Sequence, residues 1–385
     1  MFARRTDWNL RPNRLTKALQ EAQRGGAKIL DLTISNPTRV GIEYNQSAIL
    51  DALGDRKALD YDPQPQGLAS AREAVAAYYS NAGDPERIFL TTGTSEAYSF
   101  LFRLLSDPGG EMLVPKPSYP LFDFLADLDH IKLVPYALVY DHLWQIDFPS
   151  FNQALGEKAR AVVLVHPNNP TGSFVSAQER LELNAICRRR RLALIVDEVF
   201  LDYGHDGETR PTFAANDEVL TFTLSGISKV SALPQMKLGW IAVSGPPSDR
   251  TPACERLEVI ADTYLSMNAP VQLAAPVLLE QRRIVQPQLM RRIRANLGEL
   301  DRQLGRQKSC SRLEVEGGWY AVLRVPAVRS DEDFAVELVR AHSVLVHPGH
   351  FYDFASDGYL VLSLITPQEE FRVALEHLLE FANQT

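Results

Sequence analysis

Residues 221–240 read TFTLSGISKVSALPQMKLGW, and the predicted fold is built outward from them. The apolar run 219–224 indicates a buried strand, which a serine and a glycine suited to a tight turn bring to an end. We expect Lys229 to lie on the loop that follows, before a second apolar run at 238–243. Desolvation disfavours a charged lysine, and a neutral amine is the nucleophile that condenses with aldehydes. Alternatively, Lys229 is an ordinary solvated lysine, so this interpretation needs support from other motifs.

Length and composition restrict the class of protein. A chain of 385 residues exceeds one average core, so we expect two domains or one elaborated α/β domain. Its 45% hydrophobic and 23% charged residues are typical of a soluble globular protein. The net charge of -8 gives no support to nucleic-acid binding. The basic clusters at 188–191 and 291–294 fall in helix-like segments and are interpreted as solvated helix faces.

The cysteines and the N-terminal residues indicate the compartment. The three cysteines are far apart, which predicts neither a disulfide framework nor a metal site and fits a reducing compartment. The first residues lack the apolar segment of a signal peptide, and no apolar run approaches membrane-spanning length. We therefore expect a cytoplasmic protein that binds neither a membrane nor a metal.

Strands and helices are predicted to alternate from residue 68 to residue 243. The helices are expected at 68–79, 119–128 and 177–189 and after Ser95, and the strands at 88–91, 111–114, 132–136, 161–165 and 192–196, besides the two runs above. This pattern predicts a mostly parallel central sheet between two layers of helices. Crossovers of this kind place functional loops at the carboxyl ends of the strands.

The pattern changes after Pro270. A long helical region at 271–304 contains Pro276 and Pro287, which are expected to kink or break it. Short strands at 313–315, 318–325, 344–347 and 359–364 then accompany helices at 331–341 and 367–381. We assign residues 45–280 to a large domain. A smaller α+β domain is assigned to 281–385 and 1–44, in which a helix at 13–25 and a strand at 29–34 are expected.

Polar motifs follow three of the predicted strands. Gly93, Thr94 and Ser95 stand where a strand gives way to a helix, a place suited to a phosphate, although an ordinary capping box looks the same. The turn 166–172 holds two asparagines rigidly between prolines, or it is simply a structural turn. Asp197 ends a buried strand, and a carboxylate there needs a partner. That partner is a protonated heterocyclic nitrogen, an arginine or a helix N-terminus.

Together these motifs supply what a pyridoxal phosphate aldimine needs: an amine, an acid, a rigid amide and a phosphate cradle. Their order along the chain is G-T-S (93–95), P-S-Y-P (117–120), N-N-P-T-G (168–172), D-E-V (197–199) and S-K-x7-K-L-G-W (228–240). This set resembles the fold type I aminotransferases of class I/II, the group that includes aspartate, alanine and histidinol-phosphate aminotransferases. The likeness covers nearly the whole chain.

The resemblance implies a role for each matching residue. Lys229 is implied as the Schiff-base lysine and proton shuttle, Asp197 as the partner of the ring nitrogen, and Asn169 as that of the ring oxygen. Other positions are implied for stacking on the ring (Tyr119), for the phosphate (Gly93, Thr94, Ser95, with Ser225 or Ser228) and for the partner subunit's phosphate (Tyr61). The role of Tyr61 implies a homodimer.

This sequence departs from the family pattern at three places. Phe200 stands where a tyrosine often binds the ring oxygen, so we expect a shifted pKa for the imine of Lys229. Lys237 stands where an arginine usually binds the phosphate, and lysine offers a point charge instead of a fork. The arginine expected to bind the substrate α-carboxylate is replaced by Val361 or Tyr359.

Other residues are candidates for the substrate carboxylate, which needs a cationic or amide partner. Asn36 lies where the family's N-terminal loop approaches this group, and we place it in the substrate site with Arg39, Trp319 and His350. Arg324 and His347 are further candidates, although each of the charged candidates is equally compatible with a surface or turn role.

The predicted activity is the transfer of an amino group between an amino acid or amine and a 2-oxo acid. A decarboxylase or a β/γ-lyase uses the same cofactor, and the missing arginine and Phe200 keep this alternative open. A non-catalytic sensor on this fold would carry an additional DNA-binding domain, and here the fold is predicted to start within the first residues. No GxGxxG or Walker pattern indicates a nucleotide enzyme.

Overall fold

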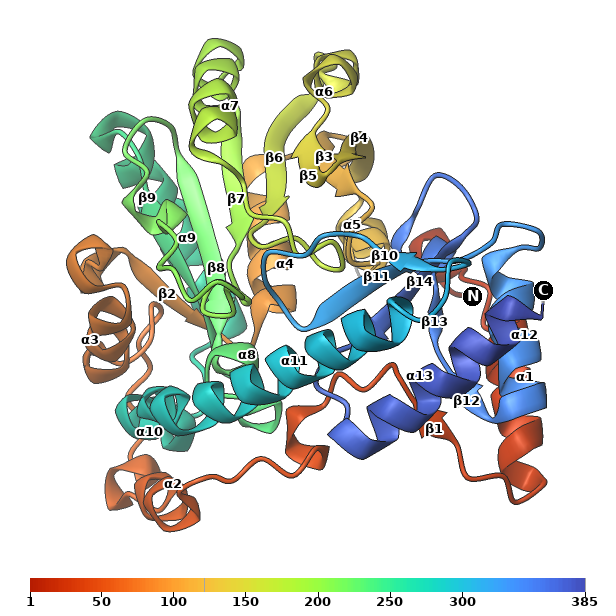
Figure 1. Cartoon of the computed structure of the whole chain (residues 1–385). Helices are drawn as coiled ribbons and strands as arrows, with labels where there is room; N and C mark the ends of the chain where they lie inside the picture. Colours follow the sequence, from red (N-terminus) through yellow and green to blue (C-terminus); the bar gives the residue numbers. More distant parts are fainter. Residues whose placement is uncertain (121, 385) are drawn as a thin grey trace.

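The computed structural model describes residues 1–120 and 122–384, and a large sheet dominates it (Figure 1). Within these residues eight strands lie in the order β2 (Ile88–Thr91), β9 (Gly239–Ser244), β8 (Thr221–Gly226), β7 (Ala193–Asp197), β6 (Ala159–Val165), β3 (Glu111–Lys116), β4 (Lys132–Asp141) and β5 (Leu143–Ile146). The four neighbouring pairs from β8 to β4 are parallel, and the other three are antiparallel. The predicted mostly parallel sheet is confirmed.

Helices cover both faces of this sheet. Nearly every residue of β6, β7 and β8 is buried, which explains their continuous apolar runs, since a strand covered on both sides has no solvent-facing positions. One face packs against helices α4 (Thr94–Leu105), α5 (Phe122–Asp129) and α9 (Pro247–Tyr264). The other face packs against α6 (Phe148–Ala154) and α7 (Ala177–Arg190) and, near β2 and β9, against α2 (Gln46–Leu53), α3 (Ala69–Tyr78) and α10 (Ala269–Glu280).

A second, smaller sheet lies beside the first. Its antiparallel strands follow the order β10 (Ser311–Arg312), β11 (Tyr320–Arg324), β14 (Tyr359–Ser363) and β13 (His347–Pro348), and β1 (Leu30–Asp31) pairs in parallel with β12 (Val344–Leu345). Their apolar side chains share one cluster with helices α1 (Arg14–Arg24), α11 (Arg282–Leu304), α12 (Asp331–His342) and α13 (Gln368–Asn383). The N-terminal elements therefore lie beside the C-terminal ones (Figure 1). The proposed division into 45–280 and 1–44 with 281–385 stays a prediction.

Three local predictions were wrong. Lys229 does not lie on a loop, because Ile227–Val230 form the one-turn helix α8. Strand β8 also continues through Gly226, which pairs with Gly239, instead of turning there. The helical region after Pro270 is broken at Gln281, between α10 and α11, and not at either proline. The buried amide of Gln281 accepts a hydrogen bond from Asn45 N and donates one to the Val277 carbonyl, which fixes the break.

The boundaries of other elements also differ from the predicted ones. The strand expected at 29–34 is reduced to the two residues of β1. The helix expected at 119–128 begins at Phe122, and Leu121 of that prediction lies outside the described residues. The hairpin of β4 and β5 and the helix α9 were not predicted.

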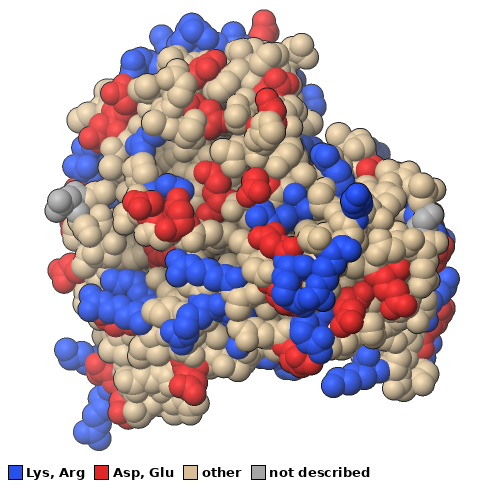
Figure 2. All heavy atoms as spheres, in the orientation of Figure 1, with Lys and Arg blue, Asp and Glu red and all other residues tan. Residues whose placement is uncertain are grey.

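The basic cluster 188–191 lies at the end of α7, and the cluster 291–294 lies within α11. Figure 2 shows acidic and basic side chains interspersed over the face on which α11 lies. On α7, Arg188 forms an ion pair with Glu218, as expected for a solvated helix face.

Candidate active site

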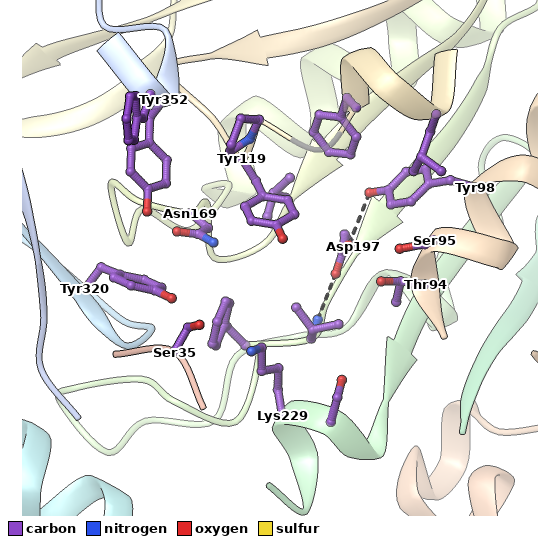
Figure 3. A pocket seen from close by; sticks show the side chains of 18 of the residues that line it. Ser35, Thr94, Ser95, Tyr98, Tyr119, Asn169, Asp197, Lys229, Tyr320 and Tyr352 are labelled. Carbon is purple, nitrogen blue, oxygen red and sulfur yellow. Dashed lines mark hydrogen bonds between the residues drawn. The ribbon is translucent and has the colours of Figure 1, made fainter. Parts of the chain in front are cut away.

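A cavity of about 490 Å³ lies at the carboxyl ends of β6 and β7 (Figure 3). The central sheet contributes the strand ends, and α4 points its N-terminus at the cavity. The small sheet and the loops around it contribute the opposite wall. Eight of the predicted cofactor residues line this one space: Thr94, Ser95, Tyr119, Asn169, Asp197, Phe200, Ser228 and Lys229.

Lys229 projects its amine into the cavity from α8. The hydroxyl of Tyr203 donates a hydrogen bond to the backbone carbonyl of Lys229 at 2.7 Å and so fixes this turn. The Nζ atom lies 4.8 Å from the centre of the Trp319 ring and 5.6 Å from that of Phe200. Burial lowers the pKa of Lys229 to about 8, partly offset by the negative charge of Asp197. The amine is therefore much closer to its neutral, nucleophilic form than an exposed lysine would be.

Asp197 ends β7 and is buried beneath the cavity. Its Oδ2 accepts a hydrogen bond from the Tyr98 hydroxyl at 3.2 Å, and its Oδ1 accepts one from Val199 N at 3.1 Å (Figure 3). Burial raises the pKa of Asp197 to about 6, and these two hydrogen bonds and the charge of Lys229 oppose that rise. No ion pair involves this carboxylate within the described chain, so it can serve a cationic group of a ligand.

The turn after β6 separates its two asparagines. The side chain of Asn168 holds the turn, because its Nδ2 donates to the Pro117 carbonyl and to Thr171 Oγ1. By contrast, the buried Oδ1 of Asn169 has no hydrogen-bond partner among the described residues. A buried amide without a partner is uncommon and marks a group available to a ligand. The structure thus assigns the structural role to Asn168 and leaves Asn169 to the cavity.

The phosphate site predicted at 93–95 lies at the start of α4. The first N–H groups of a helix have no carbonyl partner within it, and the helix dipole favours an anion there. Gly93 is the N-cap residue, and Thr94 and Ser95 line the cavity. A Cβ on Gly239 would lie 2.8 Å from the Cα of Gly93, so β9 approaches this turn as closely as glycine permits.

Apart from His347, the remaining predicted residues lie outside the cavity lining. Ser225 is buried in β8, while Lys237 and Tyr61 are exposed. Among the substrate candidates, Asn36 uses its side chain to cap the turn at Thr38. Trp319 is buried beside the Lys229 amine, and three charged candidates are exposed: Arg39, Arg324 and His350. His347 is the one charged candidate that lines the cavity.

Several lining residues were not predicted. Tyr98 follows the cap by one turn of α4, and this helical spacing was a usable signal. Among the others are Ser35, Tyr320, Phe351 and Tyr352, which reach the cavity only through the packing of the two sheets. Nothing in their local sequence indicates that position.

The cavity fits pyridoxal phosphate group by group. Lys229 offers an amine for the aldehyde, and Asp197 offers a buried acid for the ring nitrogen. The side-chain amide of Asn169 lines the cavity, and its Nδ2 is a donor suited to the ring oxygen, while the N-terminus of α4 suits the phosphate. Tyr119 projects its ring into the same space (Figure 3).

Comparison with known proteins gives one consistent result. A model of the family "Aminotransferase class I and II" matches residues 27–378. The glutamate-pyruvate aminotransferase AlaA of Haemophilus influenzae is 31% identical over 66% of this chain and 64% of its own length. The alanine aminotransferase of Mycobacterium tuberculosis is 26% identical over 92% of this chain and 86% of its own.

Solved structures share the fold over the full length. An alanine aminotransferase from Pyrococcus furiosus superposes with a TM-score of 0.89 at 21% identity, covering 100% of both chains. An aminotransferase from Escherichia coli superposes with a TM-score of 0.86 at 24% identity, covering 100% of this chain and 98% of the other.

Proposed function

Since this chain belongs to the class I and II aminotransferases, pyridoxal-phosphate-dependent enzymes of fold type I, we propose that its cavity is the centre at which it transfers an amino group between an amino acid or amine and a 2-oxo acid. The observation that carries this assignment is that Lys229 and Asp197 line the same cavity. The relatives bear the names of aminotransferases, which favours transfer over the decarboxylase or lyase alternative.

When bound, pyridoxal phosphate supplies an aldehyde for amines and a ring that accepts electrons. Four groups of this chain hold it in our proposal. Lys229 attaches to the aldehyde, Asp197 keeps the ring nitrogen protonated, and Asn169 binds the ring oxygen. Thr94 and Ser95 bind the phosphate at the N-terminus of α4, where free N–H groups and the helix dipole already favour an anion.

The Lys229 amine, when it is free, would be the group that transfers protons at the substrate. Its pKa of about 8 lets Nζ accept a proton from the substrate α-carbon and return it at nearly neutral pH. The apolar rings of Phe200 and Trp319 flank this nitrogen. One base held between two positions is sufficient for both proton movements.

The substrate is proposed to be an amino acid with an uncharged side chain. Apart from Lys229, no lysine or arginine lines the cavity within the described residues, so a second carboxylate would find no cation there. Aromatic rings form much of the wall opposite the central sheet. The names of alanine and tyrosine aminotransferases among the relatives support the same class of substrate.

The assembly is proposed to be a homodimer. Leu59 and Tyr61 are 88% and 81% exposed, although both are large and largely apolar. They line one groove with Met267, and such an exposed apolar surface is typical of an interface. Tyr61 is proposed to reach the partner subunit's phosphate from this surface.

The cytoplasm is the proposed location, supported by three cysteines that are all unpaired. In the part of the chain that the structure describes, no helix combines the length and apolar character needed to span a bilayer.

Product analysis tests the reaction. The purified protein is incubated with pyridoxal phosphate, a neutral amino acid such as L-phenylalanine and a 2-oxo acid. One new 2-oxo acid for each amino group transferred is the expected result. Release of carbon dioxide or ammonia in the same proportion would refute transamination.

A further inference from the structure

The family pattern predicts an arginine that binds the substrate α-carboxylate, and this chain has none at the matching positions. Of the two positions considered for that arginine, Val361 is buried in the core of the small sheet. Tyr359 stacks on Phe354, with ring centres 4.7 Å apart. An amino acid substrate nevertheless brings a carboxylate into the cavity, and a buried carboxylate needs a donor or a positive charge.

Three of the four charged candidates cannot supply it from this chain. Arg39, Arg324 and His350 are exposed and do not line the cavity. Arg324 lies over the ring of Tyr359, 5.7 Å from its centre, at the end of β11. His347 remains.

The register of the small sheet places His347 beside Val361, one of the two positions where the family pattern predicts an arginine. Strand β13 pairs with β14 so that His347 lies directly opposite Val361. Residues directly opposite each other in an antiparallel pair project their side chains from the same face. The imidazole of His347 therefore projects from the same face of the small sheet as the side chain of Val361, one of the two positions where an arginine was expected. The two residues lie on neighbouring strands.

The hydrogen bonds of His347 leave one ring nitrogen for a ligand. Its Nδ1 lies 3.0 Å from the Tyr352 hydroxyl, which orients the ring. Within residues 1–120 and 122–384 no side chain or carbonyl binds its Nε2. When the Tyr352 hydroxyl donates to Nδ1, the proton of the neutral ring is on Nε2, and that nitrogen becomes a donor.

The charges around His347 suit a ligand that brings its own negative charge. Burial lowers the pKa of the imidazole, and the carboxylate of Asp31 opposes this only in part. Other titratable groups on this side are the hydroxyls of Tyr119, Tyr320 and Tyr352, and burial raises the pKa of each, so they stay protonated donors. In Figure 3 these hydroxyls and that of Ser35 lie around the open part of the cavity.

We propose that His347, positioned by Tyr352, binds the α-carboxylate of the amino acid substrate in this enzyme, with the hydroxyls of Ser35 and Tyr320 as further donors. The inference rests on the proposed function of the cavity. An arriving carboxylate favours the protonated imidazole, so the pair gains a charge-assisted hydrogen bond that the free enzyme lacks. Selectivity for the carboxylate then depends on one imidazole instead of a permanent guanidinium.

Nuclear magnetic resonance of the wild-type holoenzyme tests this directly. The imidazole carbons are labelled with ¹³C, and the His347 signal is identified by its loss in His347→Asn. Propanoate is the probe, and propanamide is its neutral control. Propanoate is expected to raise the titration midpoint of His347 by about one pH unit or more, whereas propanamide leaves it in place. An unchanged midpoint with saturating propanoate would overturn the proposal.

Kinetics give a second, independent readout. L-phenylalanine is compared with 2-phenylethylamine, which lacks the carboxylate but keeps the amine and the ring. His347→Asn is expected to raise the KM for the amino acid about tenfold or more, and Tyr352→Phe to raise it less, while neither changes the KM for the amine. His142→Asn, on the exposed turn between β4 and β5, is the matched control and should behave like the wild type.

The outcomes separate the two proposals. An equal effect of His347→Asn on both substrates, or no effect on either, would overturn the role of His347 while transamination stands. If His347→Asn fails to fold, His347→Gln identifies the signal instead, and Tyr352→Phe and the titration of the wild-type protein decide the question. A wild-type protein that binds no pyridoxal phosphate would refute the proposed function, and the role of His347 with it.

Discussion

The hydroxyl of Tyr98 donates a hydrogen bond of 3.2 Å to Oδ2 of Asp197. This bond joins helix α4 to the end of β7, so the helix that offers its N-terminus to an anion also orients the buried acid. In the proposed binding mode, the residues for the phosphate and for the ring nitrogen would thereby belong to one connected unit. Misplacing either element would disturb both contacts.

Replacement of Lys229 by alanine is expected to abolish covalent attachment of pyridoxal phosphate. The wild-type protein should show an absorbance band that shifts on borohydride reduction, and the variant should show only free cofactor. Turnover should fall by about 10²- to 10⁴-fold or more, because the general base is lost. Lys308→Ala, an exposed lysine remote from the cavity, is the control. A reducible band of normal intensity in Lys229→Ala would contradict the assignment.

Asp197→Asn should lower the rate of the first half-reaction by about 10²-fold or more, because a neutral amide cannot keep the ring nitrogen protonated. Tyr98→Phe removes only one hydrogen bond to the carboxylate and should cost about tenfold or less. Stopped-flow absorbance measures both rates. Equal losses in the two variants would show that the carboxylate acts only through its orientation.

Attachment of the cofactor should depend on pH through the Lys229 amine. Burial lowers the pKa of this amine to about 8, and only the neutral form above that pKa is nucleophilic, so the attachment rate should rise as pH increases through about 8. The negative charge of Asp197 raises the pKa of Lys229, so Asp197→Asn should move the midpoint to lower pH. A midpoint near that of a free lysine, about 10.4, would show that the amine is not buried.

Phe200→Tyr should lower the pKa of the nitrogen that joins Lys229 to the cofactor. Phe200 lines the cavity, so an added hydroxyl could donate to the ring oxygen. That donor stabilises the more negative oxygen of the deprotonated state, which lowers the pKa. Visible-absorbance titrations of both proteins measure the two midpoints. Identical midpoints would exclude the effect.

Gly239→Ala should weaken cofactor binding without touching the cofactor. Its Cβ would lie 2.8 Å from the Cα of Gly93, so the turn before α4 has to move, at a cost of about 1–3 kcal/mol in stability. Fluorescence titration with pyridoxal phosphate and thermal unfolding measure the two effects. Gly298→Ala is the control, because a Cβ in that helical position meets nothing within 4 Å. It should stabilise the protein by about 0.5–1 kcal/mol. Normal cofactor affinity in Gly239→Ala would refute the coupling.

The sequence was sufficient for those residues whose position follows from one strand end. Asp197 and Asn169 come at the carboxyl ends of β7 and β6, and parallel strands bring these ends together. The sequence could not show which of the two asparagines faces the cavity. Only the packing of the turn decides that the Asn168 side chain forms hydrogen bonds within the turn and the Asn169 side chain does not. The sequence also misplaced Lys229 on a loop, since a helix of one turn has no periodicity to detect.

The wall formed by the small sheet could not be predicted. Tyr320 and Tyr352 are separated in the chain and belong to no recognisable motif, so only the packing around β11, β13 and β14 shows that they meet. The break at Gln281 was missed for a related reason. The backbone N–H of Asn45, at the start of a distant helix, donates to the Gln281 side chain at this break, whereas local rules pointed to the prolines.

Apart from Tyr61, which is proposed to reach the partner subunit's phosphate, the residues proposed to hold the cofactor lie between positions 93 and 229, whereas Ser35, Tyr320, His347 and Tyr352 come from the two ends of the chain. Genetic changes in the terminal segments can therefore alter which amino acid is accepted while the reactive centre is inherited intact. A mutant library restricted to those four positions would be the economical starting point for redirecting this enzyme to new amines.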